Sequence, residues 1–369
     1  MTGRTSSTNQ PDTLALPVVF EATDPLPISA GPVLAAQAPP SWISGTAGFV
    51  RRHGRVTMFG PNGDRVARHR VGRRRTNWKP ETPSRISGLR EPTRRATGGP
   101  IFDDRVGGGL LMVYRGEQPL AQDPHRAHAI LGTAYSDDGG DTFRDLGRII
   151  TPEVCPDSSL GSIELGSGAF VQRDDYFYVY FTDQREFGAV GNNLCVARAP
   201  VEEVLIAARR GDAVRWRKFH DGQFASAGLG GPCSDLLPGE PRVCWLDATF
   251  HEPTRLYLAV CSVITEWRHD GDHRWNHLII GSRDGLRWSP PQPLFGEERH
   301  QSQLFVTIRA DRSWSRAVTS DEFDVITTVG GGPSPFELTD ATVQTYTVRW
   351  RPLDDRSGEA TRSAQESGR

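Results

Sequence analysis

The amino-acid sequence predicts an all-β protein that folds as a five-bladed β-propeller, with four antiparallel strands in each blade. Three observations support this prediction. Apolar and polar residues alternate with a period of two in short runs bounded by Gly, Pro and Asp, as they do in half-buried strands. Convincing helical periodicity is scarce. A unit of similar strands also recurs along the chain, as in repeat architectures that close into a ring.

The five repeated units follow one another between residues 41 and 352. Each contains an inner strand, a turn, a strongly apolar strand, a strand that ends in a small polar group, and an outer strand. The units begin with GTAGFVRRHGRVTMFG, GGPIFDDRVGGGLLMVYRG, GSGAFVQRDDYFYVYFTD, LDATFHEPTRLYLAV and SQLFVTIRADRSWSRAVTS. A closed ring leaves few strand edges exposed. A sandwich or two stacked β domains would also fit the strands, but not the order of the repeats.

Two polar ends flank the predicted propeller of residues 41–352. Residues 1–40 are expected to be a partly irregular N-terminal extension, and residues 353–369 a disordered C-terminal tail, because both lack periodicity. One short helix is expected in PVEEVLIAARRGD, where apolar residues share a helical face and Gly211 follows. The apolar residues of this face are Val201, Val204, Leu205 and Ala208.

Composition and charge exclude several classes of protein. The 369 residues include 43 Lys and Arg and 45 Asp and Glu, which gives a formal net charge of -2. This balance predicts no general affinity for nucleic acid or for acidic membranes. No apolar run is long enough for a transmembrane helix. The first residues lack the apolar segment of a secretory signal, so we expect a cytoplasmic protein.

The cysteines predict buried thiols. Their number, 5, is odd, and none forms a C-x-x-C pair. A disulfide framework or a zinc site is therefore disfavoured.

A tight turn with a fixed polar pattern occurs twice. In AYSDDGGDTFRDLG, a run of strand-forming residues ends at Tyr135, and the Asp and Gly residues that follow supply the positive φ angles of a hairpin turn. We expect Asp138 to bond the turn amides and Phe143 to fold over the turn. GSRDGLRW repeats the pattern with one residue fewer. Both stretches resemble the Asp-box turn of sialidases and five-bladed glycosidases, where it has no catalytic role.

The unit GSGAFVQRDDYFYVYFTD, followed by NNLCVARAP, resembles a blade of the five-bladed glycoside hydrolases, the arabinanase, xylosidase and fructosidase-like families. The likeness extends as a pattern over most of residues 41–352. It implies an axial funnel with three carboxylates at the starts of inner strands: a base, an Asp that tunes the acid, and a Glu that protonates the leaving group. The chain departs from this pattern at Gly99 and Pro100, where the family has Asp-Pro, and at Gly45 and Thr46, where it has the base.

From this resemblance we expect Glu164 to be the general acid and Asp247 the base or its electrostatic partner. Asp247 keeps an acid at the family's position, and Glu164 lies three residues before the corresponding Ser167. Glycoside cleavage needs two carboxyl groups, about 5 Å apart for retention or about 6.5 to 9.5 Å for inversion. Other carboxylates at strand ends or in loops, which are alternatively surface or turn acids, are Glu91, Asp157 and Glu266.

Aromatic and basic side chains near the strand starts predict a ligand-binding funnel. Trp245 lies two residues before Asp247, hence on the same face of an extended strand, and Trp267 follows in a loop-like segment. Trp rings suit stacking on sugars, although packing of Trp245 between blades is an alternative. Arg94 and Arg95 would bind a substrate carboxylate or phosphate, or form a salt bridge to Glu91. The other predicted contacts are Glu91, Glu266, His300 and Gln303.

A metal ion is implied only through the resemblance. His300 lies at the start of the last unit, and some relatives hold a calcium ion on the axis with a His in a similar location. A zinc site would need His269, His273 and His277 together. Neither a metal site nor another cofactor is predicted.

These observations predict a glycoside-hydrolase-like enzyme that acts on a sugar or a glycosylated small molecule through carboxylate acid/base chemistry. The alternative is a non-hydrolytic propeller. It would be either a ligand-binding protein or a biosynthetic enzyme that catalyses a cyclisation or an elimination. The departure at Gly99 and Pro100 motivates this alternative. The sequence leaves the substrate and the oligomeric state open.

Overall fold

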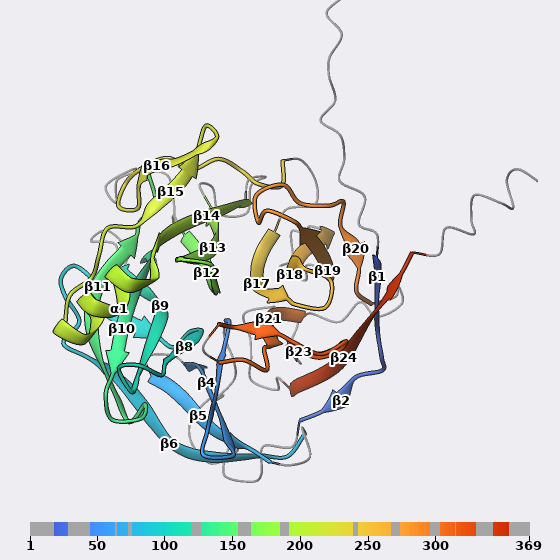
Figure 1. Cartoon of the computed structure of the whole chain (residues 1–369), viewed down its shortest axis with the longest axis horizontal. Helices are drawn as coiled ribbons and strands as arrows, with labels where there is room; N and C mark the ends of the chain where they lie inside the picture. Colours follow the sequence, from blue (N-terminus) through green and yellow to red (C-terminus); the bar gives the residue numbers. More distant parts are fainter. Residues whose placement is uncertain are drawn as a thin grey trace, which may run out of the picture.

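The computed structural model describes residues 18–28, 45–62, 65–72, 76–119, 127–153, 164–184, 192–238, 243–266, 274–295, 303–313, 315–329 and 342–353. Within these ranges the chain is almost entirely β-structure, with one helix, α1 (Val201–Arg210). The strands stand around a common axis, and the first and last parts of the chain meet in this ring (Figure 1). No helix in the described ranges is long and apolar enough to cross a membrane.

The largest sheet has nine strands and combines two antiparallel units. Its strands are β3 (Gly48–Arg52), β4 (Arg55–Asn62), β5 (Arg65–Val71), β6 (Trp78–Ser87), β7 (Arg95–Thr97), β8 (Ile101–Asp104), β9 (Gly109–Pro119), β10 (Ala127–Ser136) and β11 (Thr142–Ile150). The first unit runs β3-β4-β5-β6, and the second runs β7-β9-β10-β11 with β8 also on β9. A short parallel contact between β6 and β11 joins the two units.

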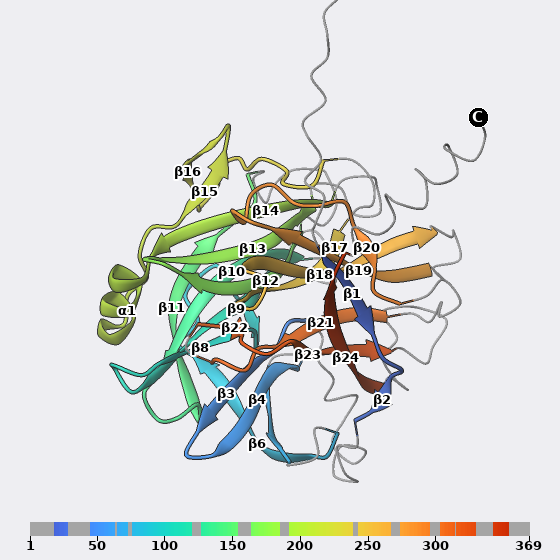
Figure 2. The same cartoon turned by 45° about the vertical axis from the view of Figure 1, so that its right-hand side comes forward.

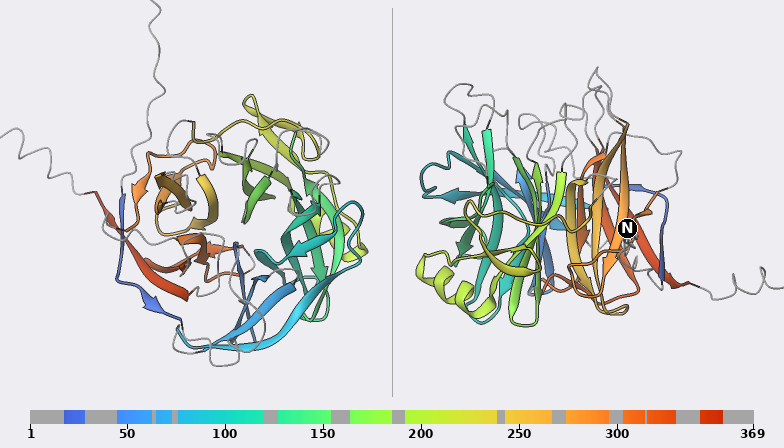
Figure 3. Two further views of the ribbon diagram at one scale, coloured as in Figure 1. Left: turned by 180° about the vertical axis from the view of Figure 1, so that it is seen from behind. Right: turned by 90° about the horizontal axis from the view of Figure 1, so that it is seen from above.

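Two further sheets have five strands each. One runs in the order β12 (Glu164–Arg173), β13 (Tyr176–Gln184), β14 (Asn192–Pro200), β15 (Arg217–His220) and β16 (Gln223–Ala227). The other runs in the order β20 (Gln292–Pro293), β19 (Arg274–Ser282), β18 (Leu256–Glu266), β17 (Val243–His251) and β22 (Ala317–Val318). The helix α1 connects β14 to β15 and lies outside the ring (Figure 3).

The last sheet combines both ends of the described chain. It contains β1 (Val18–Ala22), β2 (Leu26–Pro27), β21 (Gln303–Arg309), β23 (Glu322–Val329) and β24 (Thr342–Pro352). β1 lies antiparallel to β24, with Phe20 opposite Trp350 (Figure 2). Part of the N-terminal extension therefore covers the edge of this sheet, although the predicted propeller boundary at residue 41 excludes it.

Apolar cores fill the spaces between neighbouring units of the ring. Five such clusters occur among the described residues, and each combines side chains of two adjacent units. The cluster between the first and last units, for example, packs Phe49 and Met58 against Ile326 and Val343. Each unit thus packs against both of its neighbours through apolar side chains, so both faces of its sheet are buried.

The two predicted Asp-box turns have the expected hydrogen bonds. Asp138 accepts bonds from the amides of Asp141 and Thr142 at 2.9 to 3.0 Å. Ser136 Oγ accepts from the Gly140 amide at 2.8 Å, and Phe143 is fully buried. In the second turn, Asp284 takes the place of Asp138 and accepts from the amides of Leu286 and Arg287. The predicted turn chemistry is confirmed in both stretches.

The predicted helix is also confirmed. It spans Val201–Arg210 and buries Val204 and Ala208. Gly211 follows it with a φ of 93°, a left-handed conformation that glycine adopts at helix ends without strain.

Candidate functional site at the axis

The starts of four inner strands converge at one end of the axis, here called the axial mouth. Thr46 precedes β3, Gly99 precedes β8, and Gly168 and Trp245 lie early in β12 and β17; all four line one hollow. The other ends of β3 and β8 meet at the opposite side, called the far end, where Arg52 contacts Asp103. The inner strands therefore run in a common direction, as the repeat predicts.

Close backbone packing leaves no room for a side chain at Gly99, where the sequence departs from the Asp-Pro of the families it resembles. A Cβ atom on Gly99 would lie 1.9 Å from the carbonyl oxygen of Val113. Gly48 is similarly tight, because a Cβ there would lie 2.5 Å from the amide of Ile101. No side chain fits at Gly99 unless the backbone moves. The departure from Asp-Pro is thus built into the packing of β8 against β9.

The hollow at the mouth has a volume of about 20 Å³, roughly the space of one water molecule. Trp245 is half-buried on its wall, and its ring meets Phe305 edge to face at 5.1 Å between centroids. Arg115 also lines it and pairs with Glu117. The buried hydroxyl of Thr97 has no hydrogen-bond partner among the described atoms. The mouth therefore combines an aromatic ring, a charged pair and a free hydroxyl.

Asp247 lies below the mouth in a buried ion pair with Arg316. Both carboxylate oxygens accept from Nη2 of Arg316, at 2.8 and 2.9 Å. The amides of Ala248 and Ile308 each donate to one of them at 2.8 Å. Asp247 is 0% exposed and Arg316 2%. Burial raises the pKa of Asp247, while the guanidinium and the two amides act to lower it. These contacts fit the electrostatic role predicted for Asp247 better than that of a base in contact with substrate.

Arg316 belongs to a segment that crosses the far end of the axis. Its Nη1 donates to the carbonyl of Ala47 at 3.2 Å, and its own carbonyl accepts from Thr249. The carbonyls of Ser313 and Ser315 in the same segment accept bonds from the amides of Asp103 and Gln172. β22 then pairs with the end of β17. The last unit therefore contacts the inner strands of the second, third and fourth units at the far end, and the side chain of Arg316 reaches Ala47, the residue before β3.

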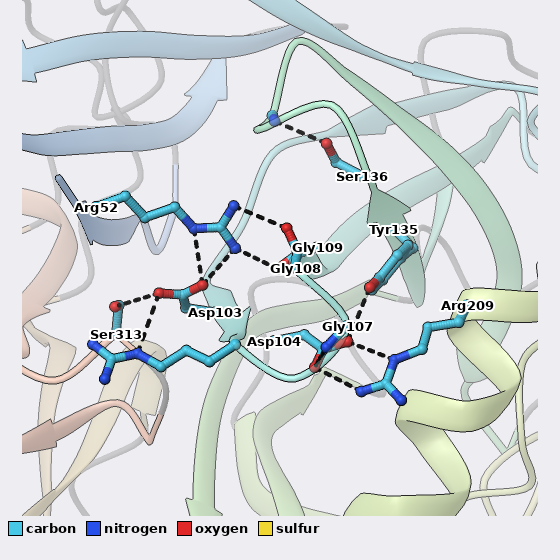
Figure 4. A network of polar contacts seen from close by, with 12 residues as sticks. Arg52, Asp103, Asp104, Gly107, Gly108, Gly109, Tyr135, Ser136, Arg209 and Ser313 are labelled. Carbon is cyan, nitrogen blue, oxygen red and sulfur yellow. Dashed lines mark hydrogen bonds and ion pairs between the residues drawn. The ribbon is translucent and has the colours of Figure 1, made fainter.

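A second charged network stabilises the far end (Figure 4). Asp103 accepts from Arg52 Nε at 3.0 Å and from Ser313 Oγ at 3.3 Å. Asp104 accepts from Arg209 at 2.8 and 2.9 Å and from Tyr135 Oη at 2.9 Å. Burial raises the pKa of Asp104, but the bonds from Arg209, Gly107 and Tyr135 outweigh it and hold that pKa below its usual value. Both carboxylates are engaged in joining units, which is a structural role.

A larger cavity of about 340 Å³ lies at the far end between the first and last units. Its charged lining residues are Arg51, Arg309, Asp311, Glu322 and Asp324. The acids have partners: Asp311 bonds Thr319, Glu322 bonds Arg349, and Asp324 bonds Arg309. Its aromatic walls, Phe49 and Phe323, are only 5% and 3% exposed. This cavity therefore offers less aromatic surface to a ligand than the half-buried Trp245 does.

The other predicted site residues are distributed as follows. Glu164 is the first residue of β12, opposite Gln184, and Gln303 is the first residue of β21. Glu266 ends β18, opposite Arg274. Nothing is described of these three side chains. Trp267, His300 and the alternative acid Asp157 lie outside the described residues.

The predicted basic pair is exposed. Arg94 forms an ion pair with Glu91 at 2.5 Å, and these side chains are 64% and 67% exposed. Arg94 thus forms the salt bridge that the sequence left open as an alternative to ligand binding. Arg95 is exposed on β7, opposite Glu117.

Four residues of the site were not predicted from the sequence: Thr97, Arg115, Glu117 and Arg316. The only signal for Arg316 is the acid Asp247 inside an apolar strand, which requires a buried cation but does not say which one. His277 is fully buried, and in the described part of the chain no three His, Cys, Asp or Glu side chains are placed to hold a metal ion.

Comparisons with known proteins show a distant likeness of fold. No protein-family profile matches the chain, and no curated protein matches its sequence. The α-L-arabinanase of Penicillium chrysogenum, solved with arabinobiose, superposes with a TM-score of 0.50 and 11% identity over 88% of this chain and 98% of that one. A protein solved as an RGII complex gives a TM-score of 0.52 and 10% identity over 84% and 87%. The α-L-arabinofuranosidase of Fusarium graminearum gives 0.49 and 12% over 89% and 98%. The superposition on the arabinanase shows that the chain shares, distantly, the fold of glycoside hydrolase β-propellers.

Proposed function

We propose that this chain is a five-bladed β-propeller that binds a carbohydrate, or a small molecule carrying a sugar, at the axial mouth. Five blades are supported by the strand order. The nine-stranded sheet divides at the parallel contact between β6 and β11 into two units, and the other three sheets supply one each. The five apolar clusters between adjacent units agree with this number.

Trp245 carries the proposal for carbohydrate binding. Its half-buried ring lines the hollow at the mouth, and the apolar face of a sugar stacks on such a ring while its hydroxyls bond polar groups nearby. The unpartnered hydroxyl of Thr97 and the pair of Arg115 and Glu117 supply donors and acceptors within the same lining or beside it. A ligand hydroxyl placed in the hollow would satisfy Thr97.

Hydrolysis is the second candidate, with Glu164 as the general acid. The observation in its favour is that Glu164 begins an inner strand at the mouth end. Its carboxylate partner is the difficulty, because Asp247 is already bonded to Arg316 and two amides. Cleavage requires a second carboxyl group that can reach water or substrate. We therefore place binding first and assign Asp247 the role of an electrostatic partner.

A binding screen with arabino-, xylo- and galacto-oligosaccharides tests the proposal. Trp245→Ala should weaken binding of any ligand found by about tenfold or more, because stacking is worth on the order of 1 kcal/mol beyond the buried area. Trp350→Ala is the matched control, since Trp350 is also half-buried but lies on the outer strand β24. Equal affinity of the wild type and Trp245→Ala would contradict the assignment of the mouth.

The same panel offered as aryl glycosides separates binding from hydrolysis. If the wild type cleaves a glycoside, and Glu164→Gln still binds it but no longer cleaves it, the result supports Glu164 as the general acid. Binding without turnover would identify the chain as the non-hydrolytic form of the fold.

A further inference from the structure

Two buried cysteines lie in contact beside β14. Cys195 is in the middle of this strand and is 0% exposed, and Cys233 is 7% exposed in the connection that leads to β17. The two thiols are close enough to interact electrostatically. Cys233 Sγ also donates to Oδ2 of Asp183 at 3.5 Å. Both cysteines belong to the same apolar cluster between the second and third units.

Backbone bonds hold the connection against β14 and so fix this thiol contact. The amide of Leu236 donates to the carbonyl of Leu194 at 2.7 Å. The amide of Leu194 in turn donates to Asp235 Oδ1 at 3.2 Å. Cys195 follows Leu194 directly, and Cys233 lies two residues before Asp235. The two cysteines are thus held together from both sides of the contact.

A buried ammonium group accompanies the pair. Lys218 is 0% exposed, and its Nζ donates to the carbonyls of Thr151 and Gly231 at 2.7 and 2.6 Å. Its charge interacts with both thiols and with Asp183. Burial and then the neighbouring Cys233 raise the pKa of Cys195, so its thiol stays protonated, and the more exposed Cys233 is placed to react first. This surrounding differs from that of Cys261, a thiol whose pKa is raised by burial alone.

We propose that Cys195 and Cys233 form an oxidisable pair that hydrogen peroxide converts into a disulfide. The sulfur of Cys233, the more exposed of the two, attacks one peroxide oxygen; the O–O bond breaks, leaving a sulfenic acid and one water. The sulfur of Cys195 then attacks that of Cys233, the S–O bond breaks, and the hydroxyl leaves with the thiol proton as a second water. The protein loses two hydrogen atoms, and the peroxide is reduced to water.

The disulfide would tie the connection after β16 to β14. This connection continues into β17, the strand that carries Trp245 and Asp247. A cross-link that closes a chain loop restricts the unfolded state. Oxidation should therefore raise the melting temperature of the whole chain.

Peptide mapping of the full chain tests this inference. The purified protein is treated with hydrogen peroxide, alkylated and digested with trypsin, which leaves Cys195 and Cys233 on separate peptides. We expect the two peptides to be linked, with the mass reduced by two hydrogen atoms, and to separate on reduction. Cys233 oxidised to sulfinic acid without a link, or both thiols unreacted in the folded protein, would overturn the proposal.

Melting temperatures provide a second test. The peroxide-treated wild type should melt at a higher temperature than the reduced protein, whereas Cys195→Ser should show no such rise. Cys261→Ser is the control and should behave like the wild type. A rise in melting temperature that persists in Cys195→Ser would contradict the assigned pair. If a variant fails to fold, the peptide map still tests the proposal, because it uses the wild-type protein.

Discussion

Removing Arg316 should destabilise the whole ring, because it leaves a carboxylate buried on the axis without its cation. In Arg316→Met, Asp247 keeps the amides of Ala248 and Ile308 but loses both bonds of 2.8 and 2.9 Å to the guanidinium. The carbonyl of Ala47 also loses its donor. Breaking one partner of a buried ion pair costs about 3 to 5 kcal/mol of unfolding free energy.

Asp247→Asn and the double variant complete a thermodynamic cycle. Asp247→Asn alone leaves the Arg316 charge buried beside a neutral amide, so it should be destabilising as well. The double variant buries neither charge. It should therefore be more stable than the sum of the single changes predicts, by about 2 kcal/mol, as for residues in direct contact.

Urea unfolding, followed by tryptophan fluorescence and by circular dichroism, measures these free energies. The two signals must give the same midpoint if the transition is two-state. Arg287→Met is the matched surface control, because the ion pair of Arg287 with Asp284 is 87% exposed on the arginine side. That variant should change stability by less than about 1 kcal/mol. A comparably small effect of Arg316→Met, or strict additivity in the cycle, would refute the reasoning.

Three further predictions concern buried histidines, the glycine at the mouth and the first Asp-box turn. Burial lowers the pKa of His69 and of His277 to about 4 from 6.5. The unfolding free energy present above pH 6.5 should thus fall as the pH decreases toward 4, by about 2 kcal/mol per histidine at about pH 5. Urea unfolding at about pH 7 and about pH 5 checks this. Equal urea midpoints at the two pH values would contradict it. Gly99→Asp should lower the melting temperature without creating hydrolysis, because its Cβ would meet the Val113 carbonyl at 1.9 Å; an active, stable variant would show the packing argument wrong. Asp138→Ala should cost about 1 to 3 kcal/mol, because the turn amides lose their acceptor; thermal unfolding against Asp137→Ala, an exposed neighbour, measures the difference.

Local patterns in the sequence predicted the features that depend on neighbouring residues. The Asp-box turn around Asp138 and the helix ended by Gly211 both follow from side chains within a few positions of each other. The shared strand face of Trp245 and Asp247 follows from the alternation of one strand. In each case the physical cause lies within a single repeat.

The features that were not predicted depend on contacts between distant segments. Arg316 reaches Asp247 from 69 positions away, and nothing in its polar surroundings distinguishes it from other arginines. Gly99 is required by the approach of the Val113 carbonyl, which only the packed blade reveals. The strand β1 pairs with β24 across almost the whole chain. A period of alternation describes a strand, but it does not say which strand lies beside it.

A crystal structure of the complex with the tightest-binding saccharide tests the proposed axial site most directly. We predict a sugar ring on the face of Trp245, with hydroxyl groups bonded to Thr97 and to the pair of Arg115 and Glu117. A saccharide bound instead in the cavity of about 340 Å³ between the first and last units, with the axial mouth empty, would contradict the account.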